Sequence, residues 1–280
     1  NCRVLVFAPG RKFDVKIVEL MSLKGRRALI TGAAGGLGIV IAETLAELGC
    51  DLILVDRKQD DIATLKHQLL STFDVSVTGS ACDLEQQDQR EALIDELVRD
   101  GQDLNILINN AAFVGTSSLS GWNVPFVEQS IETWRRALEV NLVAPFELCQ
   151  GMSQIMKHSR GANMINIASI YGQYGPDWRM YENTDINNPA AYGASKAGMI
   201  QLTKWLSTTL APDVRVNAIS PGGVFTGQPK QFVDAYSSRT PLRRMANYGD
   251  FSGAIAFLAT DMSEYVTGQV LNADGGWGVW

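Results

Sequence analysis

Tyr192 and Lys196 have the residue types and the spacing of a catalytic pair. They follow Pro189, and a proline succeeded by helix formers is typical of a helix start. Four residues apart on that helix, the two side chains lie on one face. Lowering the pKa of a phenol from about 10 to about 7 requires roughly 4 kcal/mol, and a cation about 4–5 Å away supplies most of it. The pair therefore predicts a general acid/base, although the same spacing also arises by chance and needs support elsewhere in the chain.

The composition is that of a globular protein with excess negative charge. The 280 residues are 46% hydrophobic and 19% charged, which allows one large domain or two small ones. A net charge of −6 argues against nucleic acid or an anionic membrane surface as the main partner. No apolar run reaches the length of about 18 residues that indicates a membrane span, so we expect none.

Cysteines and histidines do not form a recognisable ligand set. The cysteines are scattered without paired spacing: Cys2, Cys50, Cys82 and Cys149. We interpret them as small buried side chains in a reducing compartment, and expect a cytoplasmic protein. His67 and His158 are isolated in helix-like stretches, and we interpret both as solvated surface residues. No metal site is predicted.

Residues 1–20 fit poorly with the rest of the chain. They are mildly basic, begin without methionine, and contain an apolar run, Val4–Pro9, that is too short for a signal segment. Met21–Gly25 resembles a natural start. We therefore interpret residues 1–20 as a leader or extension and residues 21–280 as one domain, since no internal repeat or linker follows.

A strand, a glycine-rich turn and a helix follow one another after this start. The apolar run Arg27–Thr31 ends in the turn Gly32–Gly38, and the apolar positions of the next helix continue to Leu48. Glycines let a backbone approach a pyrophosphate, and a helix N-terminus offers unpaired N–H groups with a positive dipole. A second strand ends at Asp56, about twenty residues beyond the glycines, where a carboxylate can hold ribose hydroxyls. The alternative role for Asp56 is a helix N-cap.

Strands and helices alternate through the rest of the chain. We expect strands at 75–81, 104–108, 162–168, 214–219 and 268–273, helices at 85–99, 130–158, 189–210 and 249–260, and a mobile loop or small helices at 225–247. Polar residues follow strands at Asp83, Asn110 and Ser169, while Asn141 lies inside a helix, a poor position unless its amide has a task. The alternation predicts an α/β fold, a doubly wound parallel sheet covered by helices on both faces.

The motifs of the chain occur in a specific order. They are Thr31-Gly32-x-x-x-Gly36-x-Gly38, Asp83-Leu84, Asn110-Ala111-Ala112, Asn141, Ser169, Tyr192-x-x-x-Lys196 and Pro221-Gly222-Gly223. Each is weak alone, but in this order they resemble the short-chain dehydrogenase/reductase family, in its single-domain branch with a Rossmann fold. The resemblance covers roughly residues 23–276. One departure is Phe113, where the family usually has glycine.

This resemblance implies an oxidoreductase that interconverts a secondary alcohol and a ketone. Tyr192 is then expected to exchange a proton with the substrate oxygen while a hydride moves to or from the nicotinamide. By the same resemblance Lys196 favours the phenolate and binds the nicotinamide ribose. Ser169 is expected to orient the reacting oxygen, and Asn141 to hold a water that links Lys196 to solvent. The alternative is a structural role for both residues: Ser169 would cap the end of a strand, and Asn141 would mark a kink in a helix.

We expect NAD as the cofactor rather than NADP. Asp56 would oppose a 2′-phosphate by like charge, and Gly35 lies where phosphate-binding relatives often carry a basic residue. Arg57 is the opposing feature, because a guanidinium beside the ribose could tolerate a phosphate. The residues expected to bind the cofactor are Gly32, Gly36, Leu37, Gly38, Asp56, Asp83, Leu84, Asn110, Ala111, Tyr192, Lys196, Pro221, Gly222, Val224 and Thr226.

Residues 170–191 are longer than is typical of this branch, and they resemble the matching segment of nucleotide-sugar epimerases and dehydratases. Their aromatic and polar side chains suit a hydroxyl-rich ligand, so we predict a polar or sugar-like substrate; a surface insertion without a catalytic role is the alternative. Segment 170–191, through Trp178, Arg179 and Tyr181, is expected to form the substrate wall together with segment 225–247, which is expected to close as a lid. Two other functions stay open, a nucleotide-sugar epimerase or dehydratase and a non-catalytic NAD-binding sensor.

A homo-oligomer, a tetramer or a dimer, is the expected assembly. Ala144, Ala197 and Ile200 are small or apolar residues on the helices of Asn141 and Tyr192, and they suit helix packing between subunits. Trp277 and Trp280 belong to a C-terminal tail with little core of its own to enter. We therefore expect both to be buried at a neighbouring subunit.

Overall fold

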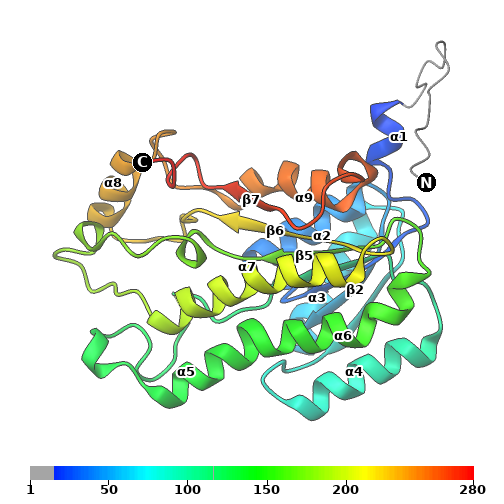
Figure 1. Cartoon of the computed structure of the whole chain (residues 1–280), viewed down its shortest axis with the longest axis horizontal. Coiled ribbons are helices and arrows are strands. Elements are labelled where there is room, and N and C mark those ends of the chain that lie inside the picture. Colours follow the sequence, from blue (N-terminus) through cyan, green and yellow to red (C-terminus); the bar gives the residue numbers. More distant parts are fainter. Residues whose placement is uncertain (1–15, 116) are drawn as a thin grey trace, which may run out of the picture.

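In the computed structural model, the described residues are 16–115 and 117–280, and they form a parallel seven-stranded sheet between two layers of helices (Figure 1). Its strand order is β3-β2-β1-β4-β5-β6-β7, which confirms the predicted doubly wound fold. The strands are β1 (Arg27–Thr31), β2 (Asp51–Asp56), β3 (Val77–Ala81), β4 (Ile106–Asn109), β5 (Asn163–Ile167), β6 (Arg215–Pro221) and β7 (Val270–Ala273). The order reverses between β1 and β4, and open α/β sheets bind ligands at such a point.

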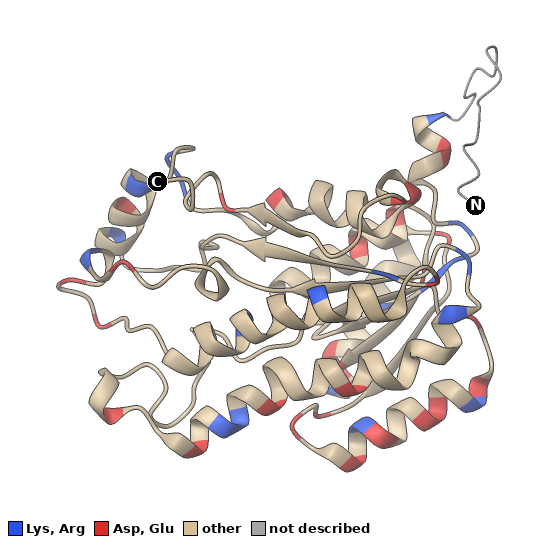
Figure 2. Ribbon diagram, viewed as in Figure 1, with Lys and Arg blue, Asp and Glu red and all other residues tan. Residues whose placement is uncertain are grey.

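Two sets of helices cover the two faces of this sheet (Figure 1). On one face lie α2 (Gly36–Glu47), α3 (Gln59–Thr72) and α9 (Ser252–Ala259). On the other lie α4 (Gln87–Asp100), α6 (Ala144–Lys157) and α7 (Ala190–Leu210). Figure 2 shows charged residues spread along the outer helix α4, whereas the longer α7 contains few.

Alternation along the strands explains why both faces are apolar. Ile30 of β1 and Ile108 of β4 pack into the core beneath α2 and α9. Their neighbours Leu29 and Leu107 pack into the opposite core with α4 and α6. Since successive side chains of a strand point to opposite faces, continuous apolar strands predict burial on both sides. The strand ends are therefore the places where polar side chains can meet.

The helix predicted at 130–158 is interrupted. Helix α5 (Ile131–Leu138) continues through a π-helical turn, Glu139–Val143, into α6. Asn141 lies in that turn with its side chain buried. A π turn inserts an extra residue into the helix, and such turns are frequent at functional sites. This geometry explains how an asparagine is accommodated in the middle of a long helical segment.

Segment 225–247 contains the short helix α8 (Lys230–Arg239), which agrees with the expectation of small helices there. The C-terminal tail folds back onto this region. Trp277 is only 1% exposed within the single chain and packs against Tyr171, Tyr174 and Tyr236. The expectation that Trp277 needs a neighbouring subunit for burial was therefore wrong. Aromatic residues from segment 170–191 and from α8 supply a core that the tail can enter.

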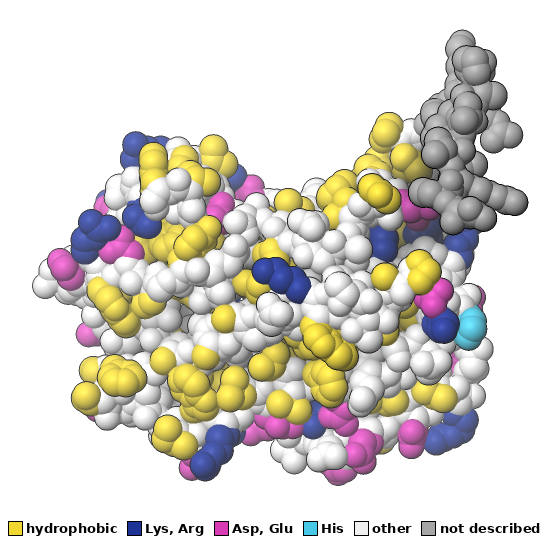
Figure 3. Space-filling view, viewed as in Figure 1, with side chains coloured by type: hydrophobic (Ala, Val, Ile, Leu, Met, Phe, Trp, Pro, Cys, Tyr) yellow, Lys and Arg dark blue, Asp and Glu magenta, His cyan; other side chains and the backbone are white. Residues whose placement is uncertain are grey.

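Two of the three residues expected on an outer helix face are also buried in the chain itself. Ala144 and Ile200 belong to the interior, and only Ala197 is exposed. The large hydrophobic residues that these helices expose are Phe146 of α6 and Trp205 of α7. In the view of Figure 3, hydrophobic side chains gather over this part of the molecule. Helix periodicity from sequence had assigned the wrong residues to the outer face.

The expected leader is only partly within the described residues. Residues 1–15 lie outside them, and Ile17–Met21 forms the short helix α1 beside the turn Asp261–Ser263. Cys50, Cys82 and Cys149 are free and buried. Among the described residues, no helix has both the length and the apolar character needed to cross a membrane.

Candidate active site

A cavity of about 600 Å³ opens at the carboxyl edge of the sheet. Every residue expected from the sequence to bind a cofactor lines it, from the Gly32–Gly38 turn to Thr226. Ser169, Tyr192 and Lys196 line it as well, whereas Asn141 lies behind its wall. The structure thus brings together residues from seven different segments of the chain in one pocket.

The glycine turn is shaped by close backbone contacts. Gly32 has a φ of +62°, and a Cβ at Gly38 would lie 2.0 Å from the carbonyl oxygen of Gly32. Asn110 braces the turn, because its Nδ2 donates to the carbonyl oxygens of Thr31 and Gly32 at 3.0 and 2.9 Å. The turn leads directly into α2, so the first residues of that helix, Gly36 to Gly38, line the cavity, as a pyrophosphate site requires.

At the far end of the cavity, Asp56 closes β2. Its two carboxylate oxygens accept from the backbone N–H groups of Ala34 and Arg57, at 3.0 and 2.7 Å. A carboxylate has about four acceptor positions, so Asp56 can still accept from two ribose hydroxyls. Arg57 is exposed and lines the same end of the cavity. The glycine turn, the carboxylate and the cavity volume of about 600 Å³ fit a nicotinamide dinucleotide.

The reactive side chains meet where β5 ends and α7 begins. Ser169 follows β5, and Lys196 Nζ donates to the carbonyl oxygen of Ile167 at 2.6 Å. Lys196 Nζ lies 5.8 Å from the centroid of the Tyr192 ring. Burial raises the pKa of the Tyr192 phenol, which Ser169 opposes by hydrogen bonding, and burial lowers the pKa of Lys196 to about 8. Both shifts reflect the cost of charge in a desolvated site.

Asn141 connects three parts of this site. Its Oδ1 accepts from Phe113 N at 2.7 Å, and its Nδ2 donates to Phe113 O and to Ser195 Oγ at 3.0 and 3.1 Å. Ser195 Oγ in turn donates to the carbonyl oxygen of Tyr192 at 2.8 Å. The amide therefore has a task. It ties the turn after β4 to the helix that carries Tyr192.

The segment 170–191 does form a wall of the cavity, through Tyr171, Tyr181 and Asn188. Two other residues expected there do not line it. Trp178 is 54% exposed, and Arg179 pairs with Asp177 on the surface. The side chains of these two residues point away because the short helical turn Trp178–Met180 buries Met180 instead.

Several residues that shape the site carry no sequence signal. The Tyr248 ring packs on Gly36, where a Cβ would lie 2.2 Å from Tyr248 Cζ. Arg90 donates to the carbonyl oxygen of Leu84 and to Glu139, at 2.7 Å each. It thereby joins the Asp83-Leu84 turn to the π-helical turn of Asn141. No motif marks these contacts, because they form between segments that are distant in sequence.

Comparisons with known proteins agree with this geometry. Residues 32–278 match a family model described as Enoyl-(Acyl carrier protein) reductase. A tropinone reductase homolog from Arabidopsis thaliana is 34% identical over 92% of this chain and 94% of its own length. A gluconate 5-dehydrogenase from Burkholderia cenocepacia, in complex with NADP and tartrate, is 28% identical with a TM-score of 0.82, over 94% of this chain and 99% of that one. An NAD+-bound xylitol dehydrogenase is also 28% identical with a TM-score of 0.80, over 91% and 99%.

Fold, cavity and relatives together define an NAD(P)-dependent oxidoreductase with a Rossmann fold. Within that class, the chain belongs to the short-chain dehydrogenase/reductase family. These relatives confirm the resemblance seen in the sequence. They do not favour a nucleotide-sugar epimerase or dehydratase, or a non-catalytic sensor, as the function.

Proposed function

We propose that the protein interconverts a secondary alcohol and a ketone with NAD, using Tyr192 as the general acid/base, on a polar substrate. The observation that carries this proposal is the convergence of Ser169, Tyr192 and Lys196 on one wall of the cofactor-sized cavity. When bound there, NAD supplies the acceptor or donor of the hydride. A phenol that exchanges a proton with the substrate oxygen at the same place completes the redox step.

Tyr192 needs positive charge nearby to act as a base, since burial alone favours its neutral form. Lys196 provides that charge. With a pKa of about 8 it is mainly protonated at neutral pH, and its Nζ lies over the Tyr192 ring. We assign Ser169 the role of donating a hydrogen bond to the substrate oxygen, which holds that oxygen beside the phenol. Asn141 ties the helix of Tyr192 to the turn after β4, and we assign it the water-holding role that the family resemblance implies.

For the cofactor, we favour NAD over NADP because of Asp56. The Asp56 carboxylate accepts hydrogen bonds from two backbone N–H groups, which hold it in place at the end of the cavity where the ribose is expected. A 2′-phosphate there would meet this negative charge. One relative was crystallised with NADP and another with NAD+, so measured kcat/KM values for NAD and NADP are the direct test.

The substrate wall consists of segment 170–191 and the part of 225–247 that includes α8. Tyr181 and Phe232 connect them, with ring centroids 5.4 Å apart. We assign the second segment a closing motion that excludes water. Its base contains Gly227, whose φ of +92° suits a hinge. Hydrogen exchange in 225–247 should slow when NADH binds, and unchanged exchange would contradict this motion.

We further propose a homo-oligomer in a reducing, cytoplasmic compartment. Phe146 and Trp205 are the exposed apolar residues on α6 and α7 that support assembly, and the buried free thiols support the compartment. A monomer by light scattering at micromolar concentration would contradict the first part. The central test of the function is NADH formation with a panel of secondary alcohols, in the wild type and in Tyr192→Phe.

A further inference from the structure

The charged residues that line the cavity are confined to the part where the cofactor is expected. They are Asp56, Arg57, Asp83 and Lys196. The described lining residues beyond Tyr192, on segment 170–191 and around α8, are uncharged. Lys196 is the nearest cation, but its Nζ donates to the Ile167 carbonyl oxygen and is buried at the base of the site. A carboxylate or phosphate on the substrate would therefore be desolvated at this wall without a cation to pair with it.

Three polar groups of this wall form a chain of hydrogen bonds. The Tyr171 and Tyr181 hydroxyl oxygens lie 2.6 Å apart, and Asn188 Nδ2 donates to the Tyr181 hydroxyl at 3.1 Å. The two phenols hold two hydroxyl hydrogens, and their mutual hydrogen bond uses only one of them. Among the described residues, no acceptor takes the second. The wall therefore presents one O–H donor that is available to a ligand.

These hydroxyls are held firmly and lie close to the reaction. Tyr171 packs edge-on against Trp277, and Tyr181 packs against Phe232. The backbone N–H of Tyr171 donates to Ser169 Oγ at 3.2 Å, which fixes this residue next to the reactive serine. Burial raises the pKa of Tyr171, with smaller contributions from Tyr181, Tyr236 and Tyr192. Tyr171 thus stays a neutral donor over the working pH range.

We propose that the Tyr171–Tyr181–Asn188 chain donates a hydrogen bond to a second oxygen of the substrate, and that this substrate is an uncharged polyol or the corresponding hydroxyketone. This inference rests on the proposed alcohol–ketone activity and names its substrate class. Buried polar groups left without a partner are costly, so a site with a committed donor selects ligands that supply an acceptor. The inference separates a neutral polyol such as xylitol from a sugar acid such as gluconate.

The first test compares three alcohols with wild-type protein and NAD. Xylitol carries the second oxygen without charge, gluconate carries it with a carboxylate, and cyclohexanol lacks it. NADH formation should give a kcat/KM for xylitol at least about tenfold above that for either of the others. A gluconate value equal to or above the xylitol value would overturn the neutral substrate class.

The second test removes the donor while keeping the rings. Tyr171→Phe and Tyr181→Phe should each raise KM for xylitol about tenfold, change kcat/KM for cyclohexanol much less, and leave KM for NAD within about twofold. Tyr174→Phe is the matched control, because Tyr174 packs on Trp277 but does not line the cavity. It should behave like the wild type. Equal losses on xylitol and cyclohexanol would mean that the hydroxyls only support packing, and would overturn the proposal.

Binding measurements make the result independent of turnover. Xylitol binding to the NADH complex of Tyr192→Phe is measured by calorimetry, with and without the added change Tyr171→Phe. Loss of affinity on the second substitution supports the proposal, and absence of xylitol binding to the first variant overturns it. Should a phenylalanine variant fail to fold, Asn188→Leu interrupts the same chain at its other end. Failure of the proposed function would give a different result: either Tyr192→Phe would retain full turnover, or no alcohol would yield NADH.

Discussion

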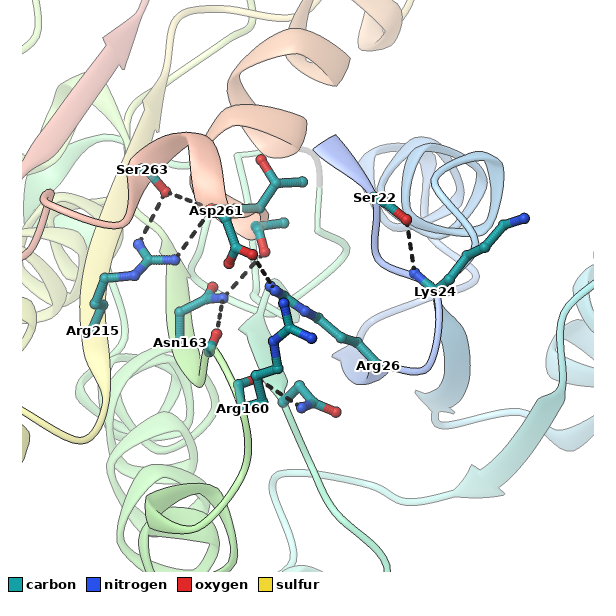
Figure 4. A network of polar contacts seen from close by, with 12 residues as sticks. Ser22, Lys24, Arg26, Arg160, Asn163, Arg215, Asp261 and Ser263 are labelled. Carbon is teal, nitrogen blue, oxygen red and sulfur yellow. Dashed lines mark hydrogen bonds and ion pairs between the residues drawn. The ribbon is translucent and has the colours of Figure 1, made fainter. Parts of the chain in front are cut away.

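The amino and carboxyl edges of the sheet both bury polar side chains, but those side chains have different partners. At the amino edge Arg26 pairs with Asp261, and Asn163 donates to the carbonyl oxygen of Ala259 (Figure 4). Arg215 reaches Ser263 and the backbone carbonyl oxygens of the turn after α9 (Figure 4). At the carboxyl edge, the polar groups around Tyr192 face a cavity instead.

Buried polar side chains therefore have two roles in this protein, one structural and one in ligand binding. At the amino edge the hydrogen bonds are made to other groups of the protein, so the network joins the sheet to α9 and stabilises the fold, although Arg26 Nη1 and Asn163 Oδ1 have no partner among the described residues. At the carboxyl edge, part of the hydrogen-bonding capacity is reserved for a ligand. Polar groups that face a cavity are therefore a functional candidate, while polar groups that bond mainly to other parts of the protein are a structural one.

The largest effect should come from breaking the carboxyl edge at Tyr192. Tyr192→Phe removes one hydroxyl and keeps the ring, so turnover should fall by roughly 10²–10⁴-fold. NADH binding, followed by fluorescence titration, should be unchanged because the cavity keeps its shape. A variant that retains more than a small fraction of wild-type kcat would exclude Tyr192 from proton transfer.

Disrupting the polar network at the amino edge should instead lower the stability of the protein and leave its KM values unchanged. Arg26→Met leaves the Asp261 carboxylate without its partner, and the loss of one member of a largely buried pair costs about 3 kcal/mol of unfolding free energy. Urea unfolding measures this loss, with the exposed Lys24→Met as the control. Below the melting transition, KM values should stay at the wild-type level. A shift in KM with unchanged stability would show that the two edges are coupled.

The sequence predicted the carboxyl edge far better than the amino edge, for a physical reason. Parallel strands end at one edge, so polar motifs that follow apolar runs, such as Asn110 and Ser169, must converge there. Arg26 and Asp261 are far apart in sequence, and no local pattern indicates that they meet. The chain of Tyr171, Tyr181 and Asn188 and the burial of Trp277 were missed in the same way. They depend on how an irregular segment folds over a tail, which periodicity does not encode.

The pH dependence of stability tests how much unfolding free energy the buried charge of Lys196 costs. Burial lowers its pKa from 10.5 to about 8, so the unfolded state binds more protons than the folded state between these values. The contribution of Lys196 to the unfolding free energy should therefore rise as pH increases from about 8, by up to about 3 kcal/mol. Cys50, Cys82 and Cys149 oppose it above about pH 8.5, because burial raises the pKa of each thiol and the thiols ionise first in the unfolded state.

Urea unfolding between these pH values checks the Lys196 prediction. The comparison is between wild type and Lys196→Met, which lacks the titrating group, so the unfolding free energy of the variant should fall more steeply with pH while the cysteines affect both proteins alike. Parallel pH dependence in the two proteins would show that Lys196 has an ordinary pKa in the fold. No part of this test requires catalysis, so it examines the electrostatics of the carboxyl edge alone.

The smallest effect should come from the far end of the cavity, at Asp56. Asp56→Ala should reduce the preference for NAD over NADP about tenfold, since the like-charge opposition to a 2′-phosphate disappears while Arg57 stays. Part of the loss should appear as a higher KM for NAD, because Asp56 also holds the backbone of Ala34 in the glycine turn. Asp60→Ala, in the exposed first turn of α3, is the matched control for removal of a carboxylate. If the wild type already uses NADPH as well as NADH, Arg57 dominates at this end, and our assignment of NAD would be wrong.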